Sequence, residues 1–126
     1  MQSVENSVEE NTTFKRSGCP IVNSLDIVGD KWTLVVLRDL HCGKKTYSDL
    51  ASSPENIPTN RLAERLKRLE SEGIVSKVLY QNHPKRYHYL LTQKGIDTLP
   101  VLQALARWGN THINNTWVPP EWFMKA

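Results

Sequence analysis

The sequence predicts an α+β, mainly α fold: a winged helix-turn-helix with a further helix at each end. A short capped helical segment, a turn and a leucine-striped helix follow one another in the middle of the chain, and together they form a helix-turn-helix. Two β-prone segments joined by a polar turn come directly afterwards and predict a hairpin, the wing. Each piece is common in proteins, so the prediction depends on their order.

Length and composition fit one small domain. A chain of 126 residues has no room for two independent cores, and 39% apolar residues suffice for one. No apolar run approaches the roughly 20 residues of a membrane span. The polar, acidic start of the chain is unlike a secretory signal, and two cysteines are too few for a disulfide framework. These features predict a cytoplasmic protein without membrane contact.

We expect three regions along the chain: an arm (1–17), a folded domain (18–113) and a tail (114–126). The arm is polar and lacks periodicity. The tail carries large aromatic residues that are expected to avoid water, namely Trp117, Trp122 and Phe123.

The first two helices of the domain carry start and stop signals. Pro20 suits the first turn of a helix, and Gly29 is expected to end that helix in the left-handed conformation. Asp30 is an N-cap candidate for a second helix over about Lys31–Leu40. The inner side of this second helix is predicted to be Trp32, Val35, Val36 and Leu40.

The predicted helix-turn-helix has its own signals. Thr46, followed three residues later by Asp49, caps a short helix that ends at about Ser52. The clearest helix of the chain then runs from Pro58 to Glu72 and ends at Gly73. Its apolar stripe consists of Leu62, Leu66 and Leu69, so Asn60, Glu64 and Lys67 face outward while Arg61, Arg65 and Arg68 line one flank.

The second half of the domain predicts a hairpin and a last helix. Ile74–Tyr80 and Tyr87–Leu91 are rich in β-branched and aromatic residues, and the polar segment 81–86 is their expected turn. Thr92 is expected to cap one long helix that continues to about Ile113 and is kinked at Pro100.

The middle of the chain concentrates positive charge. Pro58–His88 contains seven basic and three acidic residues, a net charge of +4, whereas the whole chain carries +3. A concentrated basic region indicates a polyanionic partner. On charge alone, a solvated basic face is an equally good interpretation.

Three groups of side chains are candidates for contacting double-stranded DNA. The start of a recognition helix reads bases in the major groove, where arginine pairs with guanine and asparagine with adenine; Arg68 and Lys67, further along the helix, fit phosphate better. The hairpin tip suits a minor groove or its phosphates, and the bases before the short helix suit a phosphate. The candidates are Thr59, Asn60, Arg61, Glu64, Arg65 and Arg68 on the helix, His83, Lys85 and Arg86 on the hairpin, and Lys44, Lys45 and Thr46 before the short helix.

Taken together, these motifs resemble the HxlR-type helix-turn-helix regulators, relatives of the MarR-like winged helices. The resemblance covers about residues 18–112, and it implies a bacterial transcription regulator, a homodimer built by the N- and C-terminal helices, and an operator of two related half-sites. The long apolar last helix supports the dimer independently. One departure is Pro58, which stands where the family commonly has a capping serine; the cap is therefore expected at Ile57 or Thr59. The matching stretches are Cys19-Pro20, Gly29–Thr33, Leu37–Leu40 with Gly43, Tyr47–Leu50, Ile57–Leu62, Arg65–Leu66, Glu72–Ile74, Pro84, Tyr89–Thr92 with Gly95, and Trp108-Gly109.

The resemblance also raises the question of redox sensing, because Cys19 matches the N-terminal cysteine through which some family members respond to oxidants or electrophiles. A thiol at a helix start near Lys15 and Arg16 can have a lowered pKa and react as thiolate. A buried cysteine acting as a small apolar residue is the other interpretation, and the sequence leaves both open. Cys42 is interpreted as structural. No cofactor is implied, and a small-molecule effector site between helices has no residues assigned to it.

Three other classes of function fit the sequence less well. No phosphate-binding glycine loop, nucleophile motif or metal-ligand spacing of histidines indicates an enzyme. RNA binding lacks an aromatic platform. The stronger alternative is a winged-helix module that binds protein, but such modules lose the outward bases that this chain keeps at Arg61, Arg65, Lys85 and Arg86.

Overall fold

The computed structural model describes residues 17–125. The chain forms helices α1 (Pro20–Val28), α2 (Lys31–His41), α3 (Tyr47–Ala51) and α4 (Thr59–Ser71), strands β1 (Val75–Asn82) and β2 (Lys85–Leu91), and helices α5 (Gln93–Ile96), α6 (Leu99–His112) and α7 (Glu121–Lys125). The mainly helical fold with one two-stranded antiparallel sheet is the predicted winged helix-turn-helix. The expected arm lies, except for Ser17, outside the described residues.

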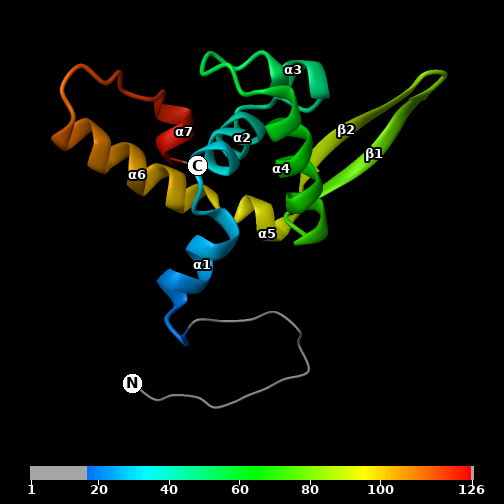
Figure 1. Ribbon diagram of the computed structural model, residues 1–126. Helices are drawn as coiled ribbons and strands as arrows, with labels where there is room; N and C mark the ends of the chain where they lie inside the picture. The colour runs from blue at the N-terminus through cyan, green and yellow to red at the C-terminus, as the bar shows by residue number, and fades with distance from the viewer. Residues whose placement is uncertain (1–16, 126) are drawn as a thin grey trace.

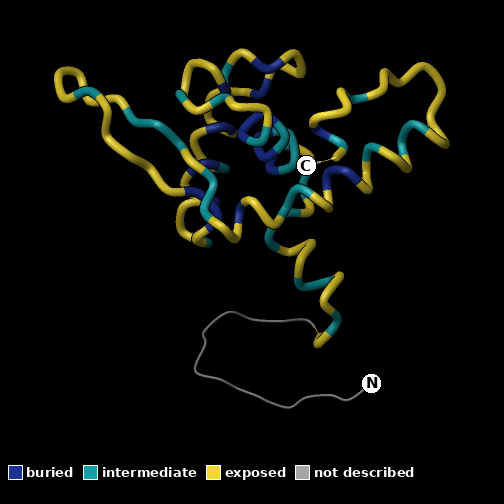
Figure 2. Tube along the Cα trace, turned by 180° about the vertical axis from the view of Figure 1, so that it is seen from behind, coloured by how far each residue is buried: buried dark blue, intermediate teal, exposed yellow. Residues whose placement is uncertain are grey.

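The elements separate into two sides (Figure 1). The hairpin of β1 and β2 projects from one side of the molecule, next to α3 and α4, whereas α1, α6 and α7 lie on the other. The buried segments gather in α2, α4 and the base of the hairpin, between the two sides (Figure 2). No helix of the described residues has both the length and the apolar character needed to cross a membrane.

The core confirms the leucine stripe of α4. Leu62, Leu66 and Leu69 are 0%, 3% and 1% exposed, so this helix buries one face completely. Full burial of such a side chain stabilises the fold by about 1.5–3 kcal/mol. The stripe packs with apolar residues of α2, α3 and the start of β1, including Leu37 and Leu50. Pro58 is the N-cap of α4, where the sequence suggested a neighbouring residue, because its extended backbone leads into the first turn without a side-chain cap.

The predicted caps of α2 and α3 are confirmed, and Gly29 differs from its prediction. The Asp30 carboxylate accepts a hydrogen bond from the Thr33 N–H at 3.0 Å, and Thr46 accepts one from the Asp49 N–H at 3.1 Å. Gly29 has a right-handed φ of −81°, so the expected left-handed ending is wrong. A Cβ at Gly29 would lie 2.4 Å from the Leu25 carbonyl oxygen. Glycine is therefore needed at position 29 because the Leu25 carbonyl leaves no room for a side chain, and not because of the φ angle.

The hairpin is longer than predicted. The expected six-residue turn, 81–86, is reduced to two residues, because the strands continue to the pair Asn82 and Lys85. The additional cross-strand hydrogen bonds join polar residues. Their side chains stay in water on both faces of this outer part of the hairpin. Val78, Leu79 and Tyr80 are 44–47% exposed, which shows that this part of β1 projects beyond the core.

The expected kinked helix from Thr92 to Ile113 consists of two helices. Thr92 caps α5 as predicted, accepting a hydrogen bond from the Gly95 N–H at 3.2 Å, but α5 ends at Ile96. Pro100 lies in the first turn of α6 rather than inside a helix. A proline has no N–H to donate, so a first turn accommodates it without loss while a helix interior does not.

The tail is folded, but only one of its three predicted anchors is buried. Phe123 is 6% exposed, whereas Trp117 and Trp122 are 72% and 58% exposed, so the expectation is wrong for the two tryptophans. The Gln103 side-chain amide holds α7 against α6 by donating to the carbonyls of Phe123 and Met124, at 2.9 and 3.1 Å. Hydrogen bonds from the Gln103 side chain to backbone carbonyls thus place the tail, together with the one buried aromatic ring.

Candidate nucleic-acid interface

The start of α4 presents polar side chains to solvent next to the hairpin side of the molecule. Thr59, Asn60 and Arg61 occupy its first turn, and all three are exposed; Glu64, one turn further on, is exposed as well. The buried leucine stripe fixes the rotation of the helix, so Asn60 and Glu64 point outward as the sequence predicted, and Arg61 on the flank is exposed as well. A helix end with exposed asparagine and arginine can form bidentate hydrogen bonds with base edges.

Arg65 and Arg68, predicted to contact DNA, point toward the junction between α1 and α2. The Arg65 side chain is only 12% exposed, and its Nε donates to Asp30 Oδ1 at 2.9 Å. Its Nη1 also donates to Glu64 Oε1 at 2.8 Å. Arg68 donates to the Asp26 carbonyl, and its Nη1 lies 3.8 Å from Asp30 Oδ2. Both guanidinium groups therefore connect α4 to the body of the protein.

The pKa of Asp30 reflects this arrangement. Partial burial opposes ionisation, but hydrogen bonds from Thr33 and Arg65 outweigh it and lower the pKa to about 2. The same carboxylate thus caps α2 and pairs with α4. The sequence analysis assigned Asp30 to the cap alone, because the pairing joins residues 35 positions apart.

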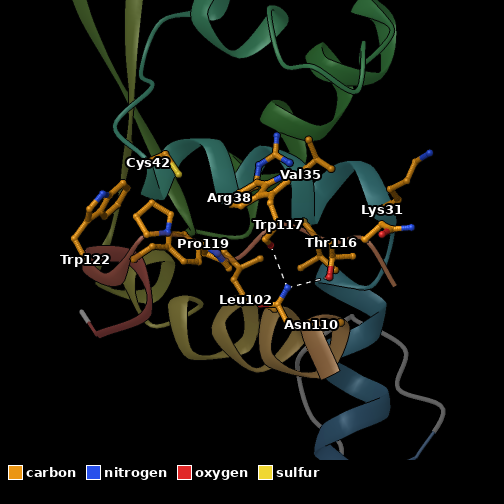
Figure 3. Close-up of a pocket in the computed structure, with 16 residues that line it drawn as sticks. Lys31, Val35, Arg38, Cys42, Leu102, Asn110, Thr116, Trp117, Pro119 and Trp122 are labelled. Carbon is orange, nitrogen blue, oxygen red and sulfur yellow. Dashed lines mark hydrogen bonds between the residues drawn. The ribbon is translucent and has the colours of Figure 1, made fainter. Parts of the chain in front are cut away.

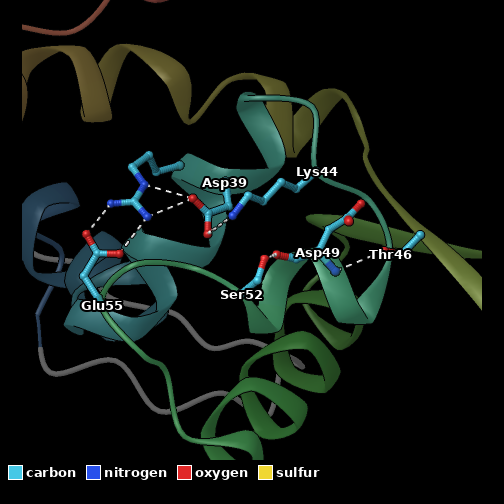
Figure 4. A network of polar contacts seen from close by, with 7 residues as sticks. Asp39, Lys44, Thr46, Asp49, Ser52 and Glu55 are labelled. Carbon is cyan, nitrogen blue, oxygen red and sulfur yellow. Dashed lines mark hydrogen bonds and ion pairs between the residues drawn. The ribbon is translucent and has the colours of Figure 1, made fainter.

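A second polar network orients the segment between α2 and α4 (Figure 4). The Arg38 guanidinium donates to Asp39 at 2.8 Å and to Glu55 at 2.7 Å, and Lys44 Nζ lies 3.8 Å from the other Asp39 oxygen. Asp39 is 4% exposed, so both cations compensate a buried carboxylate. Lys44 is therefore turned inward, whereas its neighbour Lys45 is exposed. This separates two residues that the sequence analysis placed together.

The base of the hairpin is joined to the start of α3. The Tyr89 N–H donates to the Lys45 carbonyl at 2.7 Å, and Thr46 forms a bridge with His88. A cavity of about 260 Å³ lies between these elements, and its lining is dominated by hydroxyl groups and two bases: Thr46, Tyr47, Ser48, Tyr80, Lys85, Arg86, Tyr87 and Tyr89.

This cleft brings together predicted residues that are far apart in the chain. Thr46 lies at the same cavity as Lys85 and Arg86, while His83 is exposed in the turn beyond them. Tyr47 and Ser48, as well as the tyrosines of the hairpin, were not predicted as members of this site, because tyrosine in a strand is common as a β-forming residue. Tyr47 also fixes the recognition helix, since its hydroxyl donates to the Thr59 carbonyl at 3.1 Å.

The two cysteines occupy different surroundings. Cys19 is the N-cap residue of α1 and is partly buried. Cys42 is exposed at the end of α2, where desolvation and the Asp39 carboxylate raise the pKa of its thiol. Lys15 and Arg16, expected to act on Cys19, lie outside the described residues.

The arrangement of these elements agrees with comparisons to known proteins. A sequence profile described as HxlR-like helix-turn-helix matches residues 27–117. The HTH-type transcriptional regulator YtcD of Bacillus subtilis (strain 168) is 31% identical over 103 residues, which is 82% of each chain.

Solved structures agree as well. The crystal structure of PA1607 has a TM-score of 0.74 and 28% identity, covering 83% of this chain and 75% of that one. The redox regulator HypR in its reduced form has a TM-score of 0.70 and 27% identity, covering 76% of this chain and 95% of that one. The chain belongs to the HxlR-like helix-turn-helix family of transcriptional regulators.

Proposed function

We propose that this protein is a sequence-specific, dimeric DNA-binding regulator with α4 in the major groove and the hairpin on the minor groove or backbone. The observation that carries the proposal is the exposure of Asn60 and Arg61 at the start of α4, on the side of the molecule from which the basic hairpin projects. Family membership supports this activity. We propose in addition that the protein is cytoplasmic and acts without enzymatic activity.

Within this interface, the side chains divide by role. Thr59, Asn60, Arg61 and Glu64 read bases, because they are exposed on the first turns of α4. Arg65 and Arg68 act chiefly as positioning residues, since Asp30 and the Asp26 carbonyl hold them. The proposed phosphate contacts are made by the hairpin and by the start of α3. The residues are Lys85 and Arg86 on the hairpin, His83 in its turn, and Lys45 and Thr46 before α3; Lys44, which is turned toward Asp39, lies at the edge of the interface.

The dimer in this proposal uses the exposed apolar faces of α1 and α6. Ile21 and Leu25 of α1 are 69% and 56% exposed, and Leu105 and Trp108 of α6 are 50% and 61% exposed. Apolar surface of this extent is typical of an interaction site. A two-fold dimer requires two related half-sites spaced by about one helical turn of DNA or a multiple of it.

A response to oxidants or electrophiles through Cys19 is a second candidate function. Cys19 begins α1, the helix proposed to form the dimer, so modification of its thiol alters the interface directly. HypR is a redox regulator with a similar fold. The test compares Cys19→Ser with Cys42→Ser in DNA binding before and after oxidant. Loss of the response in Cys19→Ser alone supports the role, and an unchanged response shows that Cys19 is structural.

The main proposal is tested by fluorescence anisotropy on labelled DNA from upstream of the protein's own gene, over a salt series and with scrambled competitor DNA. We expect tight binding that resists the competitor and weakens steeply with salt. Asn60→Ala with Arg61→Ala should abolish discrimination while the fold and dimer remain. Unchanged affinity in this double variant would favour the alternative, a winged helix that binds protein.

A further inference from the structure

A cavity of about 780 Å³ lies between α2, α6 and the tail (Figure 3). Val35 and Arg38 of α2 form one side, Leu102 of α6 forms a second, and the tail covers the third with Trp117 and Trp122. Its volume falls within the range of about 300–1,000 Å³ that is usual for small-molecule sites.

The tail forms a built wall rather than a loose cover. At one end, the Asn110 side-chain amide donates to Thr116 Oγ1 at 3.0 Å and to the Trp117 carbonyl at 3.1 Å. At the other end, Gln103, which is 8% exposed, donates to the Phe123 carbonyl. The tail is thus held at both ends by amides of α6, while the segment between them spans the cavity.

The exposed tryptophans of the tail line this space without filling it. Trp117 and Trp122 are 72% and 58% exposed although both belong to the cavity lining. When an apolar molecule covers a large aromatic surface that was in contact with water, the free energy of the system falls. The wall therefore has the composition of a binding surface for a flat apolar molecule.

The cavity is distinct from the proposed dimer face. On α6 the cavity is lined by Leu102, Ala106, Gly109 and Asn110, whereas the exposed large apolar residues are Val101, Leu105 and Trp108. At about 100° per residue, these two stripes point in directions roughly a third of a turn apart. A second copy of the chain on the exposed stripe leaves the cavity available.

The charges around the cavity indicate the class of ligand. Arg38 is engaged by the carboxylates of Asp39 and Glu55, and Lys31 Nζ lies 4.5 Å from the centroid of the Trp32 ring. Neither cation is directed at the cavity (Figure 3). We propose that this cavity binds an uncharged, planar, mainly apolar aromatic molecule, held between α2 and the tail.

The test uses the full chain without DNA and two related dyes. N-phenyl-1-naphthylamine is uncharged, and 8-anilino-1-naphthalenesulfonate is its sulfonated counterpart; both fluoresce more strongly in apolar sites. We expect one saturable site per chain, with the uncharged dye bound about tenfold more tightly. Absence of saturable binding, or tighter binding of the sulfonate, overturns the proposal.

Matched variants locate the site. Ala106→Trp fills the cavity and Trp117→Ala removes part of its wall, so each should weaken binding of the uncharged dye by about tenfold or more. Arg107→Ala removes a long side chain from another face of α6 and should change affinity by less than about twofold. Thermal melting shows whether each variant is folded. If Ala106→Trp does not fold, Trp117→Ala alone tests the location of the site.

Two results contradict the proposal. Dye affinity unchanged from that of the native chain in both Ala106→Trp and Trp117→Ala, or a loss confined to Arg107→Ala, places the dye outside the cavity. A shift to monomer on sedimentation of Ala106→Trp, but not of Arg107→Ala, shows that the cavity is an interface between copies of the chain. DNA binding does not enter these measurements, so their failure leaves the proposed regulatory function untouched.

Discussion

At the scale of single residues, Asp30 has more than one role. Its carboxylate accepts from the Thr33 backbone and hydroxyl, at 3.0 and 2.6 Å, and also from Arg65 at 2.9 Å. It therefore joins the start of α2 to the middle of the recognition helix. Because Arg65 is engaged in this way, it contributes to the orientation of α4 more than to base reading.

A double-mutant cycle on Asp30→Ala and Arg65→Ala should reveal this coupling in the free energy of unfolding. We expect an interaction of about 0.5–1 kcal/mol, since the pair is only partly shielded from water. Arg61→Ala is the matched control on the same helix: it should leave stability unchanged and weaken operator binding by about 1–3 kcal/mol. Additive effects of the two substitutions in urea unfolding would show that the pair contributes nothing.

The lowered pKa of Asp30 predicts an acid-dependent stability. The ordinary pKa of 3.8 applies to the unfolded chain, and the folded value is about 2, so the unfolded state takes up the proton first as the pH falls. The stabilisation is therefore complete above about pH 5 and is lost between about pH 4 and pH 2. Asp30→Asn keeps a capping side chain but removes the charge.

Urea unfolding at several pH values measures this effect. The difference in unfolding free energy between the native protein and Asp30→Asn should be largest near neutral pH and should shrink in acid. A difference that stays constant down to about pH 2 would contradict the assignment of the lowered pKa to this carboxylate.

At the scale of elements, the hairpin and the recognition helix have different proposed roles in DNA binding. The hairpin extends beyond the core as a long ladder with Lys85 and Arg86 beside the start of α3, whereas α4 is held by its leucines and its arginine contacts. A projecting basic hairpin suits phosphate contacts, which position a protein on DNA without reading sequence. Base reading is left to the first turns of α4.

Lys85→Ala combined with Arg86→Ala should therefore weaken binding to operator and scrambled DNA to a similar extent. Each lost phosphate contact lowers the slope of log affinity against log salt by about 0.9, so the double variant should lower it by about 2. Arg107→Ala, an exposed base on α6, is the control and should leave the slope unchanged. A loss of affinity for operator DNA alone would instead indicate base reading by the hairpin.

At the scale of the whole molecule, the helices α1 and α6 lie away from the hairpin (Figure 1). Ile21 on α1 and Leu105 on α6 are 69% and 50% exposed, which is costly for a lone chain in water. A dimer through these helices covers them and leaves both recognition helices free. Such a dimer also explains why α6 carries a second apolar stripe beside the one that lines the cavity.

Leu105→Glu should shift the protein from dimer to monomer in light scattering coupled to size-exclusion chromatography, because burying a carboxylate in an apolar interface is unfavourable. Operator affinity should fall with it, since a monomer contacts one half-site. Arg107→Glu places the same side chain on another face of α6 and should remain dimeric. A dimeric Leu105→Glu protein would move the interface elsewhere.

Features that depend on neighbours within a few positions could be predicted from the amino-acid sequence. The caps at Asp30, Thr46 and Thr92, the leucine stripe of α4 and the end of that helix before Gly73 all follow from local hydrogen bonding and helical periodicity. The order of these elements was sufficient for the winged helix-turn-helix. The outward direction of Asn60 and Glu64 followed from the same stripe.

The contacts of polar and aromatic groups across the fold could not be predicted in this way. The pairing of Arg65 with Asp30, the inward turn of Lys44 and the exposure of Trp117 depend on packing between distant segments. Glycine is needed at position 29 because a Cβ there would overlap the Leu25 carbonyl oxygen, and not because of its own dihedral angles. The physical reason is that periodicity encodes which face of an element is buried, whereas the ion pairs and cavities arise where several such faces come together.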